Sequence, residues 1–151
     1  MKPQPPAGLI SPDAADVADA AFEVMSQAYN IPLARLSMTG RQHANVAFVR
    51  QTAMYLCHVV GQLTVRDIAL IFGREPSTVS HACHAVEDRR DLEIFDQQLS
   101  LLEAALRARL AERRAERRAD RDRLALPAPS TQADPGLEKK SARVLLRRLA
   151  G

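Results

Sequence analysis

Residues 63–86, with the sequence LTVRDIALIFGREPSTVSHACHAV, constrain the fold of this chain more strongly than any other stretch. Apolar residues recur there with the period of a helix, first at Val65, Ile68, Ala69, Ile71 and Phe72, then at Val79, Ala82, Cys83 and Val86. Thr64 and Asp67 form a capping pattern, Gly73 interrupts the period, and Pro76 suits the first position of a helix. The stretch therefore predicts two short helices joined by a four-residue turn, a helix-turn-helix.

The exposed side of the second predicted helix carries groups suited to nucleic acid. Its polar side chains are small hydroxyls and imidazoles, from Ser77, Thr78, Ser80, His81 and His84. Such side chains suit a helix that enters a DNA groove. Two short helices around a glycine turn also occur in helical domains that bind no DNA, so the pattern alone leaves both interpretations open.

The residues before this motif predict further helices. Ser11 followed by Pro12 marks the start of a helix that runs to about Tyr29, and residues 33–36 can add one more turn. The Pro-rich residues 1–10 are expected to be disordered. Helix formers dominate the composition, so the expected fold class is all-α.

A polar loop and a core helix are expected between residues 37 and 60. Arg41 in the loop is either an ordinary solvated side chain or an arm that reaches a phosphate or the minor groove. Asn45 is expected to cap the helix from Val46 to about Val60, which Gly61 ends. This helix would form the core against which the helix-turn-helix packs.

A long helix is predicted from about Leu92 onward. Its apolar stripe recurs every three or four residues, at Phe95, Leu99, Leu102, Leu106 and Leu110. After this stripe the sequence is almost entirely charge and alanine, which favours a solvated helix over a coiled coil. Near the end of the chain a short basic amphipathic segment has Leu137, Val144, Leu145 and Leu149 as its apolar side and is expected to bind a partner.

These patterns divide the chain into five segments. The expected boundaries are a disordered N-terminus at 1–10, the helix-turn-helix domain at 11–110, a charged helical extension at 111–125, a linker at 126–136 and the amphipathic helix at 137–151.

Composition and charge narrow the functional classes. The sequence has no stretch apolar enough for a membrane span and no secretory signal at its start. Cys57 and Cys83 fall on apolar faces, as small buried side chains of a protein in a reducing cytoplasm would. The net charge is +3, and seven arginines oppose four acidic residues between positions 32 and 90. This mildly basic middle is consistent with phosphate contact.

Three stretches of the sequence resemble the C-terminal DNA-binding domain, domain IV, of DnaA, the bacterial replication initiator. Arg50-Gln51-Thr52-Ala53-Met54-Tyr55-Leu56 is similar to that family's core helix. Leu63-Thr64-Val65-Arg66-Asp67-Ile68 is similar to the helix before the turn. Gly73-Arg74-Glu75-Pro76-Ser77-Thr78-Val79-Ser80-His81-Ala82 resembles the family motif G-R-D-H-T-T-V-x-H-A. The resemblance extends from Ile31 to about Leu110.

The resemblance implies a DnaA-like helix-turn-helix whose second helix enters the major groove. The residues it places at DNA are Arg41, Arg50, Arg74, Glu75, Pro76, Ser77, Thr78, Ser80 and His81. Pro76 replaces a base-reading histidine of the family, and its side chain can neither donate nor accept a hydrogen bond. Phe48-Val49 replaces an Arg-Pro pair, which leaves Arg41 as the candidate for the minor-groove arginine. A target other than the family's replication-origin sequence is therefore expected.

The expected function is sequence-specific binding of double-stranded DNA by a transcription regulator, similar to the DnaA-like half of gene-transfer-agent activators. No nucleotide-binding G-x-x-x-x-G-K-[ST] motif occurs, so no ATPase activity, nucleotide or other cofactor is expected. The cysteines and histidines show no C-x-x-C spacing, so neither an enzyme nor a metal site is expected. We expect a cytoplasmic, nucleoid-associated protein whose C-terminal helix contacts RNA polymerase or a sigma-factor-like protein. The alternative is an adaptor or modulator of replication initiation that acts through protein contacts.

Overall fold

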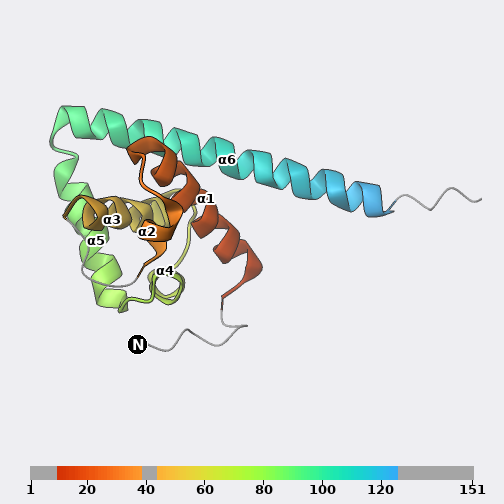
Figure 1. Cartoon of the computed structure of the whole chain (residues 1–151), viewed down its shortest axis with the longest axis horizontal. Coiled ribbons are helices and arrows are strands. Elements are labelled where there is room, and N and C mark those ends of the chain that lie inside the picture. Colours follow the sequence, from red (N-terminus) through yellow and green to blue (C-terminus); the bar gives the residue numbers. More distant parts are fainter. Residues whose placement is uncertain (1–9, 39–43, 126–151) are drawn as a thin grey trace, which may run out of the picture. The chain divides into compact units, whose positions relative to one another are not determined.

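The computed structural model describes residues 10–38 and 44–125 of the 151-residue chain. Within these ranges the fold is all-α, as expected, and holds no strand (Figure 1). The helices are α1 (Pro12–Tyr29), α2 (Leu33–Ser37), α3 (Ala44–Val59), α4 (Val65–Phe72), α5 (Pro76–Arg89) and α6 (Glu93–Ala125). None of the helices in the described ranges combines the length and the apolar character of a membrane span.

The chain divides into two compact units, Met1–Glu116 and Arg117–Gly151. In the first unit α3 lies at the centre and contacts α1, α2, α4 and α5 (Figure 1). The largest fully buried side chains come from every helix of this unit, among them Met25, Leu36, Leu56, Ile68, Val79 and Leu99. The described part of the second unit is the last turns of α6, where Arg123 pairs with Asp120 at 3.7 Å.

The first helix begins and ends where the sequence predicts. The amide of Ala14 donates to the hydroxyl of Ser11 at 3.1 Å, and Pro12 lies in the first turn. Asn30 ends the helix in a left-handed conformation with φ 52°, which asparagine tolerates better than most residues. The extra turn expected at residues 33–36 is present as α2.

The core helix differs from its prediction at the start. The helix includes Ala44, so Asn45 lies inside its first turn and does not cap it. The predicted inward face is confirmed at Val46, Val49, Ala53, Leu56 and Cys57, which are all buried, but not at Val60, which is half-buried and follows the end of the helix. The face is broader than predicted, since Met54 and Tyr55 are also buried.

The end of α3 approaches α1 closely at Gly61. A Cβ atom placed there would lie 2.3 Å from Cγ1 of Val17 and 2.7 Å from the carbonyl oxygen of Cys57. Both distances are far below van der Waals contact, so a glycine is required for this approach. Gly61, which lies two residues after the end of α3, therefore sets how tightly this end of α3 packs on α1.

The long helix α6 covers the core with the predicted stripe. Leu99, Leu102, Leu106 and Leu110 are buried, whereas Phe95 is half-buried and packs against the ring of Phe48 with centroids 5.6 Å apart. The leucine stripe therefore serves the core of this domain.

The turn between α4 and α5 is built around Gly73. Three residues separate the two helices, one fewer than the pattern predicts. Gly73 has φ 61°, and its neighbour Arg74 donates its amide to the carbonyl of Ala69 at 2.9 Å. This left-handed end of α4 fixes the direction in which α5 begins.

Replacing Gly73 by alanine is expected to lower the free energy of unfolding by about 1–2 kcal/mol, because a Cβ atom is unfavourable in the left-handed region. Urea denaturation followed by circular dichroism measures this change. Gly73→Asn is the control and should cost less, since asparagine tolerates this conformation. Equal losses for both variants would contradict the backbone explanation.

Candidate nucleic-acid interface

The first turn of α5 presents the residues that the sequence predicts for DNA contact. Glu75 is the N-cap residue in extended backbone, and Pro76 occupies the first helical position. Pro76, Ser77 and Thr78 are exposed, whereas Val79 is fully buried. The next turn continues the same division, with His81 exposed, Ser80 half-buried and Ala82 buried.

The buried stripe of α5 holds this exposed turn in place. Val79, Ala82, Cys83 and Val86 are buried, as predicted, and face a core shared with α3 and α4. The capping pattern of the preceding helix is also present. The amide of Asp67 donates to the hydroxyl of Thr64 at 3.1 Å, and that hydroxyl donates to the Asp67 carboxylate at 2.8 Å. Both helices of the motif are thus fixed independently of any ligand.

The N-terminus of α5 is suited to an anionic partner. The amides of the first helical turn lack intrahelical acceptors, and the helix dipole places partial positive charge there. Pro76 has no amide hydrogen, and the amide of Thr78 donates to the carbonyl of Glu75 at 3.0 Å. The amide of Ser77 is the remaining donor of this turn, and it lies next to two exposed hydroxyl groups. A phosphate oxygen is an appropriate acceptor at such a position.

The structure places Arg50 differently from its prediction as a DNA contact. Its side chain is buried, with 6 % of its surface exposed. Its Nε donates to the carbonyl of Leu36 at 3.0 Å, and its Nη2 donates to the carbonyls of Arg35 and Met38. Arg50 therefore joins α3 to the last turn of α2. Burial, and secondly the nearby charge of Arg74, lower the pKa of its guanidinium.

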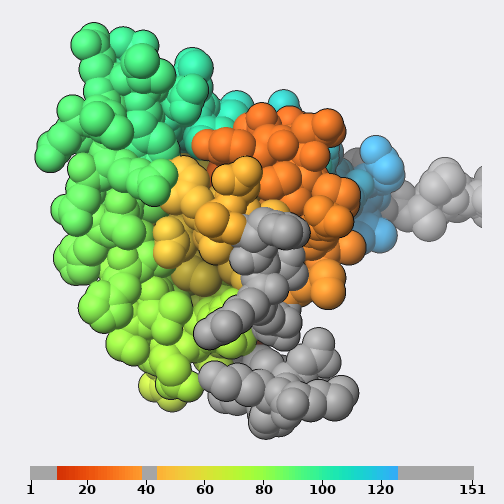
Figure 2. Space-filling model, turned by 60° about the vertical axis from the view of Figure 1, so that its left-hand side comes forward, coloured from red at the N-terminus to blue at the C-terminus, as the bar shows by residue number. Residues whose placement is uncertain are grey.

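Arg89 and Arg35 add positive charge near α3, although the sequence analysis assigned neither of them to DNA contact. The guanidinium carbon of Arg89 lies 4.1 Å from the centroid of the Phe48 ring, a cation–π contact. Phe48 stands where the resemblance leads us to expect an arginine, so a cation from α5 lies over that position. Figure 2 shows the green surface that includes α5 beside the yellow-orange surface of α3. A hollow of about 580 Å³ there is lined partly by Arg35 and Arg89.

One further predicted DNA-contact residue, Arg74, and one cation outside the prediction, Arg66, can be placed. Arg66, which the sequence analysis did not assign to DNA, is exposed in the first turn of α4. Arg74 is half-buried in the turn. Arg41 and the apolar residues of the C-terminal segment, Leu137, Val144, Leu145 and Leu149, lie outside the described residues.

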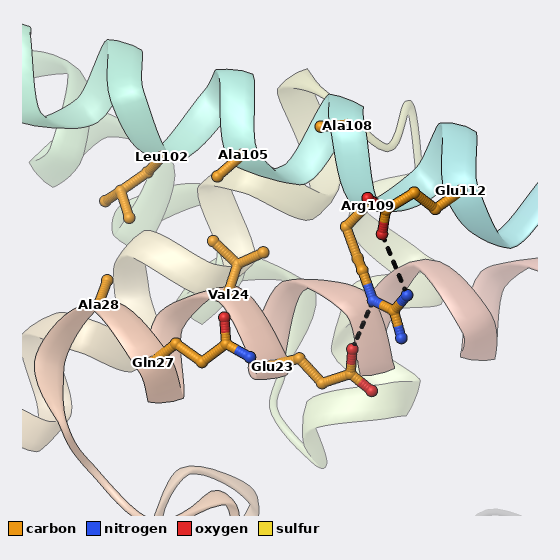
Figure 3. Close-up of a pocket in the computed structure, with 9 residues that line it drawn as sticks. All are labelled: Glu23, Val24, Gln27, Ala28, Leu102, Ala105, Ala108, Arg109 and Glu112. Atoms are coloured by element: carbon orange, nitrogen blue, oxygen red, sulfur yellow. Dashed lines mark hydrogen bonds and ion pairs between the residues drawn. The ribbon is translucent and has the colours of Figure 1, made fainter.

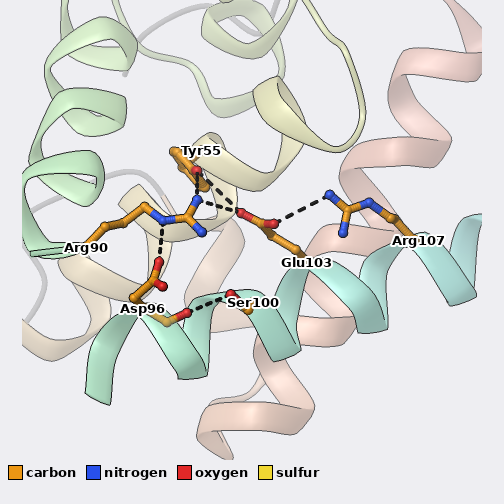
Figure 4. A network of polar contacts seen from close by, with 6 residues as sticks. All are labelled: Tyr55, Arg90, Asp96, Ser100, Glu103 and Arg107. Atoms are coloured by element: carbon orange, nitrogen blue, oxygen red, sulfur yellow. Dashed lines mark hydrogen bonds and ion pairs between the residues drawn. The ribbon is translucent and has the colours of Figure 1, made fainter. Parts of the chain in front are cut away.

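A polar network fixes the C-terminal end of α5. Arg90, its C-cap residue, donates from Nε to Asp96 at 2.6 Å and from Nη1 to Tyr55 at 2.7 Å and to Glu103 at 3.0 Å (Figure 4). The hydrogen bond to Asp96 is the main reason that the pKa of Arg90 is raised. Arg107 reaches the same Glu103 carboxylate from one turn along α6, at 3.5 Å. This Arg90 network joins α5 to both α3 and α6.

The cysteines are buried, as predicted. Burial, with a smaller contribution from Cys83, raises the pKa of Cys57 to about 12. An activated thiol nucleophile needs the opposite shift. Within the part of the chain that the structure describes, no three His, Cys, Asp or Glu side chains lie together as metal ligands.

These features define a helix-turn-helix domain, the class of fold in which a second helix is held with one face free for DNA. The family model described as "Bacterial dnaA protein helix-turn-helix" matches residues 18–86. Residues 18–86 are therefore similar to the DnaA-type helix-turn-helix, as the resemblance implied, and this similarity supports DNA binding.

Curated relatives match over the same region. The chain is 38 % identical over 82 residues to the chromosomal replication initiator protein DnaA of Lachnoclostridium phytofermentans, covering 52 % of this chain and 18 % of that protein. The corresponding protein of Tropheryma whipplei is 30 % identical over 88 residues, covering 57 % and 18 %. That of Ralstonia nicotianae is 35 % identical over 81 residues, covering 52 % and 15 %. The chain thus spans less than a fifth of the length of these relatives.

Proposed function

We propose that this chain is a sequence-specific, double-stranded DNA-binding transcription regulator, a promoter-binding activator that has no ATPase activity. The observation that carries the proposal is the exposed first turn of α5, held by a buried stripe behind it and by the left-handed end of α4 before it. A DnaA-type helix-turn-helix presents its second helix in this way. The proposal places this turn in the major groove.

Base reading falls to the first residues of α5. The carboxylate of Glu75 can accept from the amino group of a cytosine, and the hydroxyl of Ser77 can donate or accept. Pro76 can offer only an apolar contact, such as one with a thymine methyl group. The proposed target therefore differs from one read by a histidine at this position.

Phosphate contacts position the domain without carrying sequence information. The exposed side chains of Thr78 and His81 and the cation of Arg74 serve this role in our proposal, together with the half-buried Ser80. Arg41 is proposed to reach the minor groove. Arg66 on α4 adds an exposed cation on the helix that crosses the backbone in this class of domain.

Two substitutions in the first turn of α5 should distinguish side chains that recognise bases from side chains that contact phosphates. Ser77→Ala should change the preference among DNA sequences, with each lost base contact worth about 1–3 kcal/mol. Thr78→Ala should weaken binding to all sequences alike, because a phosphate contact carries no sequence information. Fluorescence anisotropy titrations against a panel of duplexes measure both effects. Both side chains are exposed, so the fold should be unchanged in circular dichroism.

An equal loss on every duplex for Ser77→Ala would contradict its base-reading role. A change of preference for Thr78→Ala would contradict its assignment to phosphate.

Genome-wide occupancy of the tagged protein in its own cells tests the proposed function directly. The control is the double variant Thr78→Ala, Arg41→Ala. Sharp peaks upstream of coding genes that disappear in the control are the expected result. A broad signal that is unchanged in the control would overturn promoter-specific regulation.

A second candidate function is that of a non-enzymatic adaptor or a modulator of replication initiation. It is favoured by Pro76, which removes a hydrogen-bonding side chain from the reading turn, and by the relatives, which are named as replication initiators. Salt dependence discriminates the two candidates. A DNA reader should lose affinity steeply as salt rises, in proportion to the phosphates it neutralises. An adaptor should show no preference among DNA sequences.

The proposed activator recruits RNA polymerase or a sigma-factor-like protein through residues 137–149, as the amphipathic pattern of that segment suggests. Gene-transfer-agent activators, which join a DnaA-like region to a sigma-factor-like region, supply the comparison. We place the protein in the cytoplasm, at the nucleoid. Deleting residues 137–151 should abolish promoter activation but retain DNA binding, and unchanged activation would overturn the recruitment role.

A further inference from the structure

One exposed side of α6 carries no charged residue between positions 94 and 111. We call it the uncharged strip, and it consists of Ile94, Gln98, Leu101, Ala105 and Ala108; the charged Glu112, five turns after Ile94, follows on the same side. All five are exposed, and the two largest, Ile94 and Leu101, are 75 % and 72 % exposed. The charged residues of this part of α6 lie on other sides of the helix, where Arg107 pairs with Glu103 and Arg109 pairs with Glu23. A solvated helix has no physical need for such a strip.

The surface is hollowed along one edge of the strip. A hollow of about 460 Å³ lies between α1 and α6, with Val24 and Ala28 on one side and Ala105 and Ala108 on the other (Figure 3). A second hollow, of about 370 Å³, adjoins it and is lined partly by Leu101. The two hollows share Ala28, Leu102 and Ala105. The larger hollow is also lined by Glu23, Arg109 and Glu112, so an apolar side chain presented from outside fits best in the smaller hollow, beside Leu101.

The distribution of side-chain size along the strip indicates what covers it. Residues seven apart lie on nearly the same side of a helix. The row that starts at Ile94 continues with Leu101, Ala108 and Ala115, so it is large in its first half and small in its second. A second copy in antiparallel orientation places Leu101 of each chain against Ala108 of the other. In the same register Ile94 lies against Ala115, whereas parallel copies would oppose large residues to large ones.

The charges fit the same arrangement. No like charges meet within the strip, because it carries none. The proposed contact extends beyond the strip to Ala115 and so includes Glu112, which falls opposite Gln97 of the second copy in this register. The Gln97 amide can donate to that carboxylate. We propose that the uncharged strip of α6 is a two-fold, antiparallel homodimer interface.

The size of the strip sets the strength of this dimer. The 21 residue steps from Ile94 to Ala115 span about 32 Å at the rise of an α-helix, and a helix is about 10 Å wide. Each copy then contributes roughly 300 Å², against about 800 Å² per partner in a standard stable interface. The dimer is accordingly weak and depends on protein concentration. The alanines of both copies allow the two α6 helices to approach each other closely, which partly offsets the small buried area.

Sedimentation velocity of the full chain across a concentration series, without DNA, tests the proposal. The wild type should shift from monomer to dimer as concentration rises, whereas Leu101→Arg should remain monomeric because it places a charge in the seam. Leu124→Arg is the matched control, since Leu124 is an 87 % exposed leucine of the same helix outside the strip, and it should dimerise like the wild type. A wild type that is monomeric at every concentration, or a Leu101→Arg variant that dimerises unchanged, overturns the proposal.

Disulfide trapping tests the register and protects the result against a folding defect in Leu101→Arg. Leu101→Cys mixed with Ala108→Cys should form a disulfide-linked heterodimer under mild oxidation, whereas Leu101→Cys mixed with Leu124→Cys should not. Cys57 and Cys83 are buried and should not contribute. Equal trapping of both mixtures overturns the antiparallel seam. Because no DNA is present, failure of the dimer leaves the proposed DNA-binding function untouched.

Discussion

Arg90→Met is expected to lower the free energy of unfolding by about 2–4 kcal/mol, because it removes one cation from a network of largely buried groups. Glu103 is 8 % exposed and Tyr55 is 3 % exposed. Both lose the hydrogen bond from the guanidinium when it is deleted, and Glu103 keeps only two longer ones, from Tyr55 at 3.4 Å and from Arg107 at 3.5 Å. Methionine keeps the aliphatic part of the side chain, so packing contributes little to the loss. Urea denaturation followed by circular dichroism measures it.

Arg107→Met is the matched control for this prediction. It removes the same charge from the same Glu103 carboxylate, but the side chain of Arg107 is 59 % exposed. An ion pair one turn apart on a helix is worth only about 0.3–0.5 kcal/mol when its cation is exposed to water, as that of Arg107 is. Losses of similar size in the two variants would show that the Arg90 network contributes no more than a surface ion pair.

Arg50→Met is expected to cost a similar amount, about 2–4 kcal/mol, for a different reason. The buried guanidinium donates to the carbonyls of Arg35, Leu36 and Met38, and its deletion removes all three of these hydrogen bonds at once. The exposed Arg35 supplies the control, and Arg35→Met should change stability by less than about 0.5 kcal/mol. Thermal or urea unfolding measures both variants.

DNA titrations with the folded Arg50→Met variant distinguish the two roles considered for this residue. A direct phosphate contact would reduce the slope of log affinity against log salt by about 1. We expect the slope to be unchanged, because the guanidinium is occupied by carbonyls inside the domain. A reduced slope would restore Arg50 to the DNA interface and contradict the structural role.

The local features of this fold follow from residues close together in the sequence. Ser11, Thr64 and Gly73 act within one helical turn of their partners, so the limits of α1, α4 and α5 could be predicted nearly to the residue. The inward faces of α5 and α6 follow from the 3.6-residue period for the same reason. Asn45 shows the limit of this reasoning, because the helix starts earlier and the residue that could cap it becomes part of its first turn.

The candidate site was predicted in part. The exposed first turn of α5 follows from the helical period, whereas the role of Arg50 depends on carbonyls 12 to 15 residues away. The contact of Arg89 with Phe48 and that of Arg90 with Tyr55 join different helices, so no local pattern indicates them. Sequence periodicity also identified only one of the two faces of α6. The buried leucines give a strong signal, but alanines and glutamines exposed on another side give a weak one.

The Arg90 network lies at the C-terminal end of α5, and this position affects how accurately the first turn of α5 can recognise a DNA sequence. The helix has 14 residues, so its first turn lies about 20 Å from the Arg90 network along the helix axis. A tilt of roughly 5° about the anchored end moves the first turn through about 1.7 Å, which exceeds the width of the hydrogen-bond distance range, about 0.5 Å. Contacts to phosphates adapt to such a shift more readily than hydrogen bonds to base edges. Loosening this anchor should therefore reduce discrimination between DNA sequences before it reduces binding itself.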